Sequence, residues 1–554
     1  MNANTSKPKL SIQDMIAKIK AEQEAAKQEK QEPLIETPNT KTNTNATGMS
    51  GESITYNSNQ QSFIDTVISG ASCVLNGAAG TGKTTATQGA VKGLIDSGAI
   101  PILKDTAHKH LKDGAPGIVI ISYTRRAVNN IRKVQSDDLK ACCLTAHKLL
   151  EYAPVYYEDT DPETGVPKKT MRFEPSRNQT TPLPSSIKTI LVEEASMLSE
   201  ALYNEINAAL LHKVQWIFIG DLNQLPPIFG PAILGFKLNE LPVIELTEVY
   251  RQALESPIIR LAHRILSGTP LPAEEYPTWH VPNELTIHPW KKKLSEDLAT
   301  NTAAAFFKKA YDNKLYDPEE DMILIPFNKS CGTLEVNKHM ANHISKLRDE
   351  LTYEVVAGFN KHYFSVGDYV LYDREDAVIS EIRTNYSYTG ARFQKPSSNL
   401  DYWGYNCKAA EERALRGESQ EEIDDVDFLL EAVMKGEGED RVNQASHEIT
   451  VRLQDTGQEV SLTKAAEINN LLHSYALTVH KAQGSEWRKV FILLHSSHAT
   501  MLQRELLYTA VTRAREELYV ICEPESFTNG IKSQKIKGTT LAEKAEYFKG
   551  KQRK

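Results

Sequence analysis

The sequence is poor in cysteine, and the spacing of its cysteines argues against two kinds of site. The 554 residues contain six cysteines, none of them in a CxxC pair. Structural zinc sites and disulfide frameworks both need cysteines that recur at short or regular spacings. We therefore expect the six thiols to be small, buried apolar groups in a reducing compartment.

Long apolar runs are also missing. No stretch reaches the length of about 18 apolar residues that a membrane-spanning helix needs. The first residues, MNANTSKPKL, lack the apolar segment that follows the basic residues of a secretory signal. We therefore expect no membrane contact and a cytoplasmic location.

An overall positive charge is absent as well, since the formal net charge is −8. Proteins that bind nucleic acid are often basic. Here the acidic residues are concentrated, because residues 408–440 hold 12 Asp and Glu against four Lys and Arg. That stretch accounts for the whole net charge, so a local basic groove elsewhere stays compatible with the composition.

From about residue 53 the sequence alternates short apolar strands with helices, after a biased arm over residues 1–52 that ends in a Thr- and Asn-rich linker. The expected strands are at 72–75, 118–122, 189–192, 216–219, 322–325, 489–494 and 518–521. This alternation is typical of doubly wound parallel sheets. The expected fold class is α/β with two stacked cores, of which only the first has a phosphate loop.

Three insertions interrupt these cores. Residues 155–175 are expected to form a β-hairpin around a turn that contains Pro and Gly. Residues 355–390 are expected to form short strands of a small β-barrel. The barrel resumes after a polar, acidic insertion at 391–446.

A glycine-rich string stands between the first expected strand and a helix. It fits GxxxxGK[ST] and comprises Gly77, Ala78, Ala79, Gly80, Thr81, Gly82, Lys83 and Thr84. The glycines let backbone N–H groups turn inward around phosphates. Lys83 is expected to reach the β- and γ-phosphates of ATP, and the Thr84 hydroxyl to ligate Mg²⁺. The next residue, Thr85, is included in the expected nucleotide site.

Two carboxylates, Glu193 and Glu194, end the strand expected at 189–192. Hydrolysis assisted by Mg²⁺ needs one carboxylate for the metal shell and another to polarise the attacking water. Gln224 follows the strand at 216–219 within GDLNQLPP, and its amide can donate to a γ-phosphate. A surface turn fixed by the two prolines would explain Pro226 and Pro227 but not the whole string.

Two arginines are candidates for cations that meet the charge developing on the γ-phosphate. Arg251 lies in LTEVYRQ and Arg513 in LLYTAVTRAREELYV. Either arginine alone is also compatible with a surface ion pair. For the single strand, stacking or backbone contacts are expected from Tyr123, Arg125, Arg126 and Tyr388.

Together these strings resemble superfamily-one helicases, and within them the RecD/Pif/Dda-like group that moves 5′ to 3′. The greatest likeness is to the Dda-type helicases of bacteriophages. The resemblance covers about residues 53–530. Its motifs, in order, are YNSNQ, GAAGTGKT, SYTRRAVNNI, LTAHKLL, LVEEAS, GDLNQLPP, LTEVYRQ, PFNKS, YALTVHKAQGSE and LLYTAVTRA.

The resemblance implies a role for each matching residue. Gln60 would read the adenine edge, and Glu486 would lie near the ribose. Glu194 would activate water, Gln224 would sense the γ-phosphate, and Arg251 and Arg513 would act as fingers from the second core. The positions that match DNA-contacting residues are Thr124, His147, Thr478 and His480.

One residue departs from the family pattern, which usually has Asp and then Glu at the metal strand. Here Glu193 precedes Glu194. We hypothesise that a bridging water takes up the extra methylene, because Mg²⁺ keeps several waters. The alternative is weaker metal binding and slower turnover.

The resemblance also implies a domain plan with two RecA-like cores. The first would span 53–150 and 180–255, and the second 256–354 and 471–530. The inserted hairpin would occupy 151–179 and the barrel 355–470, with a basic C-terminal tail at 531–554. The hairpin is a candidate wedge for strand separation, and an ordinary decorated loop is equally compatible with its sequence.

The implied activity is translocation 5′ to 3′ on single-stranded DNA by a monomer that consumes ATP with Mg²⁺ and unwinds forked or tailed duplexes. DNA replication, recombination or repair would be its setting, in the host cytoplasm for a viral protein. A single-strand-binding or replication protein is a further expected partner. Two alternatives stay open, a translocase that strips proteins from DNA with little unwinding and a motor directed by RNA.

Overall fold

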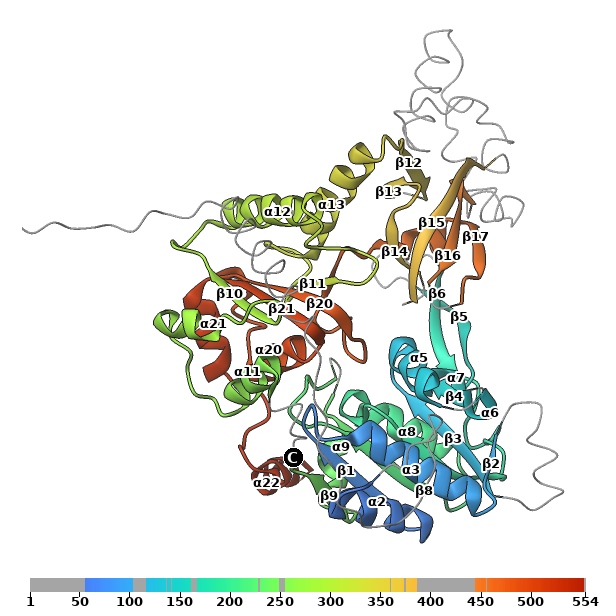
Figure 1. Cartoon of the computed structure of the whole chain (residues 1–554). Helices are drawn as coiled ribbons and strands as arrows, with labels where there is room; N and C mark the ends of the chain where they lie inside the picture. Colours follow the sequence, from blue (N-terminus) through green and yellow to red (C-terminus); the bar gives the residue numbers. More distant parts are fainter. Residues whose placement is uncertain are drawn as a thin grey trace, which may run out of the picture. The chain divides into compact units, whose positions relative to one another are not determined.

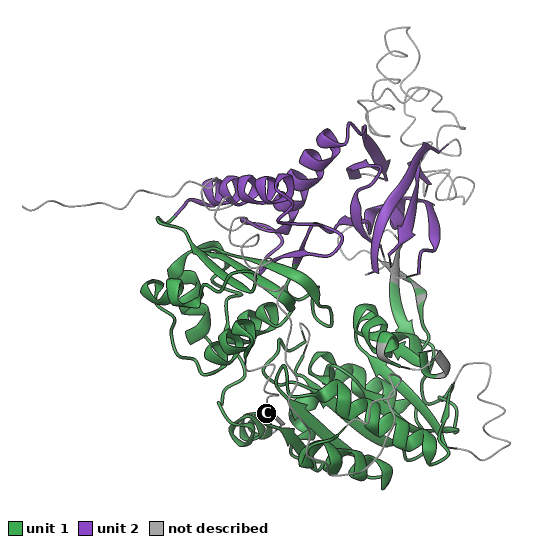
Figure 2. Cartoon of the chain, viewed as in Figure 1, with its two compact units in different colours: residues 1–293, 478–554 green, residues 294–477 purple. Residues whose placement is uncertain are grey.

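The computed structural model divides the chain into two compact units (Figure 2), residues 1–293 with 478–554 as unit 1 and residues 294–477 as unit 2. It describes residues 55–102, 116–135, 137–140, 142–160, 167–227, 230–248, 255–358, 360–372, 375–385, 444–454 and 456–552. The expected N-terminal arm, most of the acidic insertion, Arg251 and Tyr388 lie outside the described residues.

The first sheet of unit 1 has the strand order β2-β3-β7-β8-β1-β9, with β4 beside β3 (Figure 1). Every pairing in it is parallel. The strands are β1 (Cys73–Gly77), β2 (Ile100–Pro101), β3 (Gly117–Ser122), β4 (Cys143–Thr145), β7 (Ile187–Val192), β8 (Gln215–Gly220) and β9 (Val243–Leu246). The parallel α/β core expected from the sequence is confirmed, and the four expected strands of this core each lie within one to three residues of an observed one.

Helices cover both faces of this sheet. The helices are α2 (Ser58–Ile68), α3 (Lys83–Asp96), α5 (Arg125–Val134), α6 (Asp137–Lys140), α7 (Ala146–Leu149), η1 (Ala195–Met197), α8 (Glu200–Ala208) and α9 (Ile233–Lys237). Neighbouring strand residues serve opposite faces, since Leu75 packs with α2 and α3 while Val74 packs with α8 and α9. This arrangement follows from the alternation of side chains along a strand and buries nearly continuous apolar strands.

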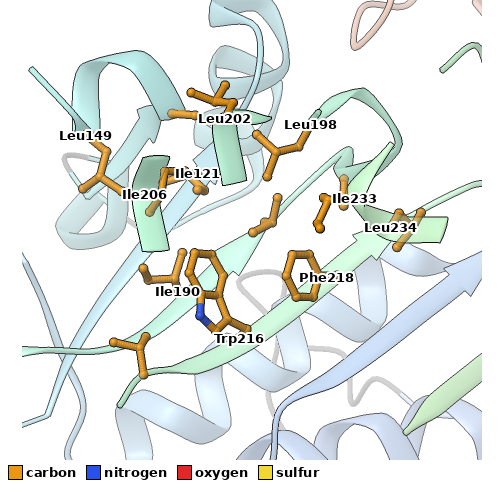
Figure 3. Packing of buried hydrophobic residues seen from close by; sticks show 14 of the residues in the cluster. Ile121, Leu149, Ile190, Leu198, Leu202, Ile206, Trp216, Phe218, Ile233 and Leu234 are labelled. Carbon is orange, nitrogen blue, oxygen red and sulfur yellow. The ribbon is translucent and has the colours of Figure 1, made fainter. Parts of the chain in front are cut away.

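Figure 3 shows one of the two apolar clusters that flank this sheet, where side chains of β3, β7 and β8 meet Leu202 and Ile206 of α8 and Ile233 and Leu234 of α9. Trp216 and Phe218, two residues apart on β8, stack with ring centroids 5.6 Å apart. Their burial against Leu202 and Ile206 of α8 stabilises the fold, because apolar area removed from water contributes about 25 cal/mol per Å².

The expected β-hairpin is confirmed as a separate two-stranded sheet of β5 (Tyr152–Thr160) and β6 (Pro167–Pro175). At its base, Glu151 adopts a left-handed backbone conformation with φ 50°. The Arg177 backbone nitrogen donates to Leu150 O at 3.1 Å, and its guanidinium contacts Glu151 Oε1 at 3.0 Å. The chain therefore leaves and rejoins the first core at one clamped point.

The second sheet of unit 1 contains the parallel strands β10 (Leu285–Pro289), β21 (Ala514–Cys522) and β20 (Trp487–Leu494). Its helices are α11 (Pro257–Leu266), η2 (Ala273–Trp279), η3 (Ser496–His498), α20 (Arg504–Val511) and α21 (Pro524–Lys532). The segment predicted as a basic C-terminal tail contains α22 (Leu541–Gln552), which packs on α9 of the first core through Phe548 and Phe236. Tail residues thus belong to the folded part of the chain.

Unit 2 contains α12 (Glu296–Asp312), α13 (Thr333–Leu347), α19 (Ala465–Asn469), β11 (Met322–Ile325) and β19 (Ala476–Thr478). Its antiparallel sheet has the order β13-β12-β16-β15-β14-β18, with β17 beside β16. The strands are β12 (Thr352–Ala357), β13 (Asn360–Ser365), β14 (Tyr369–Tyr372), β15 (Glu375–Thr384), β16 (Gln444–Leu453), β17 (Glu459–Lys464) and β18 (Leu472–His473). The expected strands are present, and the expected small β-barrel is present in part, as a curled half-barrel in which the end strands β13 and β18 do not pair with each other among the described strands.

One expectation from composition is confirmed within the described part of the chain. The described cysteines, namely Cys73, Cys142, Cys143, Cys331 and Cys522, are buried, as expected of small apolar groups. No helix in the described ranges combines the length and the apolar character that crossing a membrane requires.

Candidate nucleotide site

Three loops of the first core leave neighbouring parallel strands. The phosphate loop follows β1, Glu193 and Glu194 follow β7, and residues 221–227 follow β8. In the sheet these strands are adjacent in the order β7-β8-β1. Because the carboxyl ends of parallel strands meet at one sheet edge, the three sequence motifs are brought together there, which is where open α/β sheets bind ligands.

The phosphate loop has the backbone that its glycines predict. Gly80 and Gly82 both have φ of 79°, a left-handed conformation that other residues adopt only with strain. A Cβ on Gly77 would lie 2.6 Å from Thr81 Oγ1, so this position too has no room for a side chain. The loop leads directly into α3, whose first residues are Lys83, the exposed Thr84 and the partly exposed Thr85. The N-terminus of a helix suits phosphate binding, because its backbone N–H groups and its dipole favour negative charge.

Lys83 and Gln60 contact the loop from two sides. The Lys83 ammonium donates to Gly77 O at 2.7 Å and Ala78 O at 3.0 Å. Gln60 is fully buried; its Nε2 donates to Gly82 O at 3.1 Å, and its Oε1 accepts from Asn57 N at 3.0 Å. Gln60 therefore braces the end of the phosphate loop, a contact that the implied role in adenine recognition did not include.

Glu193 and Glu194 occupy different environments although they are neighbours. Loss of hydration and then the Glu194 carboxylate raise the pKa of Glu193 to about 7, against the opposing effects of Thr87 and Lys83. Glu194 has φ 51°, a left-handed conformation that is rare for a side chain of this size. Strained residues of this kind cluster at functional sites.

Two oxygen atoms at this edge are buried without a hydrogen-bond partner among the described residues, Glu194 Oε2 and Gln224 Oε1. Buried polar atoms are nearly always paired, and exceptions need an explanation. A water between a carboxylate that accepts its proton and a bound triphosphate would supply the partner for Glu194. The donor set of Lys83, Thr84 and the loop amides fits a triphosphate, and the Glu193 carboxylate would suit a Mg²⁺ ion bound with it.

The loop that carries Gln224 is organised by a buried carboxylate, Asp221. Its Oδ1 accepts from the backbone and side-chain nitrogens of Asn223 at 2.9 and 2.8 Å. Leu222 N donates to Asn76 Oδ1, at the end of β1, at 3.2 Å. Gln224 is 5% exposed, and its backbone nitrogen donates to Asp221 O at 3.1 Å. The Gln224 side chain is therefore presented by a rigid turn.

Helix α20, which packs with the second sheet of unit 1, contacts the same loops. The Tyr508 hydroxyl donates to Asp221 Oδ2 at 2.6 Å and accepts from Ala79 N of the phosphate loop at 2.8 Å. Thr509 Oγ1 accepts from Leu225 N at 2.9 Å. Burial and the neighbouring Asp221 raise the pKa of Tyr508 far above its usual value, so the phenol keeps its proton.

Arg513 follows α20 and is 4% exposed. Its guanidinium donates to Thr509 O and Ser485 O, each at 3.1 Å, and to Thr512 Oγ1 at 3.3 Å. It lies close enough to Tyr508 to act on that residue's pKa. The predicted finger is thus positioned by its own core beside the nucleotide loops, whereas Arg251 lies outside the described residues.

The KAQGSE motif packs on α5 of the first core. Arg126 donates to Lys481 O at 3.2 Å and lies 5.6 Å from the centroid of Trp487. Gly484 has φ 77°, and a Cβ there would lie 2.7 Å from Ala127 Cβ. Arg126, proposed from the sequence as a DNA contact, is buried in this packing, which leaves it poorly placed for a nucleic acid. Glu486, in the same turn, is exposed.

The remaining residues predicted to contact DNA lie in two groups. Thr124 caps α5 by accepting from Ala127 N at 3.1 Å, and Arg125 is exposed beside it. The His147 ring lies 5.5 Å from that of Tyr123. In the second group, burial and then Lys535 lower the pKa of His480.

Thr478 precedes His480 by two residues and is buried, with its Oγ1 accepting from Lys481 N at 3.4 Å.

The rings of Tyr123, His147 and Tyr152 form an aromatic cluster, in which the His147 and Tyr152 ring centroids are 5.0 Å apart. Tyr152 in turn hydrogen-bonds Glu205 of α8. This cluster lies at the foot of the hairpin, since Tyr152 is the first residue of β5.

Two residues of this site were not singled out from the sequence, Tyr508 and Asp221. Both stand inside quoted motifs, LLYTAVTRA and GDLNQLPP. Asp221 could have been found from the sequence, because it is a carboxylate directly after a buried strand, as Glu193 is. A tyrosine in an otherwise apolar helix resembles an ordinary core residue, so only the three-dimensional structure assigns it a contact.

Comparison with known protein families yields two matches. Residues 60–230 match an AAA domain, and residues 473–521 match the UvrD-like helicase C-terminal domain. The two matched segments lie in the first core and in the second α/β segment of the chain, respectively. The first match includes the phosphate loop, both carboxylates and Gln224, and the second includes Arg513.

Comparison with curated proteins yields relatives along most of the chain. The ATP-dependent RecD2 DNA helicase of Deinococcus radiodurans is 27% identical over 460 residues, which are 83% of this chain and 48% of the relative. The RecBCD enzyme subunit RecD of Buchnera aphidicola is 21% identical over 495 residues, 82% of this chain and 70% of that subunit. This chain thus spans about half the length of the RecD2 relative.

Among solved structures, the Pif1 helicase of Candida albicans covers 90% of this chain and 99% of its own, with 15% identity and a TM-score of 0.43. Bacteroides Pif1 in complex with ADP-AlF3 and single-stranded DNA covers 90% of this chain and 98% of its own, with 14% identity and a TM-score of 0.45.

Proposed function

We propose that this chain is an ATP-dependent DNA helicase of the RecD and Pif1 type that moves 5′ to 3′ on single-stranded DNA and unwinds duplex. Both matched domains, and the similarity to a relative named as an ATP-dependent RecD2 DNA helicase, support the activity. The direction, the unwinding of tailed duplexes and the likeness to Dda-type helicases are carried over from the resemblance of the motifs.

One observation carries this proposal most directly. Glu194 is held in a left-handed conformation at the sheet edge where the phosphate loop and Gln224 also lie, with Oε2 buried and unpaired among the described residues. A carboxylate that only stabilised the fold would be paired or solvated. A general base for water needs a carboxylate with a free lone pair facing the phosphate loop.

The residues of the site divide the chemistry among themselves. Mg²⁺, held by Thr84 and Glu193, would neutralise phosphate charge when bound. Lys83 can leave its two carbonyl acceptors for phosphate oxygens, since an ammonium gains more from an anion than from neutral carbonyls. Glu194 takes the proton of the attacking water. Gln224 and Arg513 orient and neutralise the phosphoryl group.

The link to movement runs through α20. The contacts of Tyr508 and Thr509 join this helix to Ala79, Asp221 and Leu225. A change at the phosphate loop therefore acts on the second sheet of unit 1 through hydrogen bonds, as γ-phosphate loss does in other phosphate-driven switches. Thr124, Arg125 and His147 on one side and Thr478 and His480 on the other would grip the strand.

Strand separation needs a wedge, because each base-pair step costs about 1.4 kcal/mol on average. We assign this role to the β5–β6 hairpin. Its nine-residue strands pair only with each other among the described strands, and its base is clamped by Arg177. A stiff arm on a fixed base suits a wedge better than a loop without internal pairing.

The experiment that tests the function compares duplexes that carry only a 5′ or only a 3′ single-stranded tail. ATP-dependent unwinding of the 5′-tailed duplex alone is the expected result. Unwinding confined to the 3′-tailed duplex would overturn the direction. Displacement of a bound protein without strand separation would favour the translocase, and stronger stimulation of ATP hydrolysis by RNA would favour an RNA motor.

A further inference from the structure

The segment after α21 runs from the second sheet of unit 1 to the first core. It leaves α21 at Lys532 and ends in α22, which lies on α9. Two anchors hold it, one at each end. Both anchors contact elements of the nucleotide site.

The first anchor is Glu505, a buried carboxylate on α20. It accepts from Lys535 N at 3.0 Å and from Ile536 N at 2.8 Å. Arg504, the preceding residue, donates from its backbone nitrogen to Ser533 O at 2.8 Å. The start of the segment is therefore attached to the helix that also carries Tyr508.

The second anchor is Lys544 of α22, which is 5% exposed. Its ammonium donates to Asn223 Oδ1 at 2.5 Å and to Leu222 O at 3.4 Å. Both acceptors belong to the turn that presents Gln224. Asn223 also donates to Asp221, so the ammonium completes a chain of contacts from α22 to the buried carboxylate.

Apolar packing holds α22 in place around this lysine. The rings of Phe548 and Phe236 lie edge to face with centroids 5.4 Å apart. A Cβ on Gly235 would lie 2.3 Å from the Phe548 ring, so glycine is needed for the helix to approach. Asn239 Nδ2 donates to Ala545 O at 3.0 Å.

A helix that only covered an apolar patch would have no reason to bury an ammonium. Removing a charge from water is unfavourable unless it is paired and hydrogen-bonded. Loss of hydration lowers the pKa of Lys544, while Asp221, Glu505 and Glu245 oppose that effect. The Lys544 ammonium is thus held where it can donate to Leu222 and Asn223 of the turn.

We propose that residues 533–552 form a strap that ties α20 to the turn of Asp221–Leu225, with Lys544 as the positioning residue that orients Asn223 and Gln224 for ATP hydrolysis. This proposal rests on the proposed ATP-driven function. The strap links the second sheet of unit 1 to the γ-phosphate-sensing turn by a path separate from Tyr508. Residues 533–552 would therefore affect the rate of ATP hydrolysis.

The test uses K544M, which keeps the length of the side chain and removes its charge. The full chain should fold, and its DNA-stimulated kcat should fall about tenfold with KM for ATP changed by less than about threefold, as expected for an interaction that orients the transition state. K544R should recover most of the rate. K549M, on an exposed lysine of the same helix, is the matched control and should match the unaltered protein.

A second measurement does not depend on turnover. The amides of Leu222, Gln224 and Leu225 are hydrogen-bonded, so amide hydrogen exchange reports the order of the turn. K544M should speed their exchange about tenfold or more while β1 keeps its protection. Unchanged exchange in the turn, or a K544R variant as slow as K544M, would overturn the strap. An unaltered protein without ATPase activity would instead overturn the proposed function and leave the exchange result to decide.

Discussion

The Tyr508 hydroxyl contacts the Ala79 backbone nitrogen at 2.8 Å and Asp221 Oδ2 at 2.6 Å, so one side chain of α20 serves two loops of the nucleotide site. Replacing it by Phe removes both hydrogen bonds and keeps the ring. The free energy of unfolding should fall by about 1–3 kcal/mol, since a buried carboxylate loses a partner. Urea denaturation measures this loss. Y363F, which removes a hydroxyl from an exposed ring of unit 2, is the control and should change stability by less than about 0.5 kcal/mol.

Glu194 gives separate predictions for turnover and for stability. E194Q should lower ATP hydrolysis by about 10²–10⁴-fold with ATP and single-strand binding retained, because the amide cannot accept a proton. E194G should be more stable than E194A by about 1 kcal/mol, because only glycine adopts the left-handed backbone freely. Equal stability of E194G and E194A would contradict backbone strain at residue 194. Rapid ATP hydrolysis by E194Q would contradict the role of Glu194 as the general base.

The substitution E193D restores the carboxylate spacing that is usual in the family. Because the longer side chain contacts Thr87 and a bridging water can span the difference, we expect the ATPase rate to stay within about threefold of the unaltered protein. The measurement is ATP hydrolysis with single-stranded DNA across a series of Mg²⁺ concentrations. A large loss of rate would show that the length of Glu193 matters for this site.

Two residues of the expected DNA grip should differ in their dependence on salt. Arg125 is exposed and charged, so R125A should weaken single-strand binding and reduce the slope of log K against log salt by about 1. His480 has a lowered pKa and is neutral near pH 7.5, so H480Q should weaken binding with the slope unchanged. Fluorescence anisotropy with a labelled oligonucleotide at several salt concentrations separates the two. Equal slopes for R125A and the unaltered protein would remove Arg125 from the interface.

The hairpin assignment is tested by deleting residues 161–166 at its turn. ATP hydrolysis stimulated by single strands should survive, because the site residues lie on other elements. Unwinding of a tailed duplex should fall by about tenfold or more, since the wedge no longer reaches the junction. If the shortened protein unwinds the duplex as well as the unaltered protein, the hairpin is not the wedge.

The sequence was most informative where local chemistry decides the structure. Apolar runs such as 322–325 match β11 residue for residue, and the glycine-rich string predicted a loop between strand and helix, in which Gly80 and Gly82 are left-handed. A loop of this kind needs glycine whatever surrounds it. Burial of a strand likewise follows from its own composition.

Contacts between distant segments could not be predicted in the same way. Tyr508 and Ala79 are 429 residues apart, and their hydrogen bond depends on how α20 packs on the first core. Lys544 stands in a segment whose lysines suggested only a basic tail, and its burial depends on space left by Gly235. The small barrel was predicted only in part for a related reason, because strand alternation predicts strands but not whether the end strands pair.

The clamp at the hairpin base sets what an applied load would meet. Among the described residues, β5 and β6 join the first core through residues 150–152 and 175–177, where Arg177 contacts Leu150 and Glu151 and Tyr152 hydrogen-bonds Glu205 of α8. Breaking these contacts would let the hairpin move relative to the first core without unfolding either strand. The stiffness of the hairpin and the stiffness of its attachment to the first core are therefore separate properties, and mutations can change one without the other.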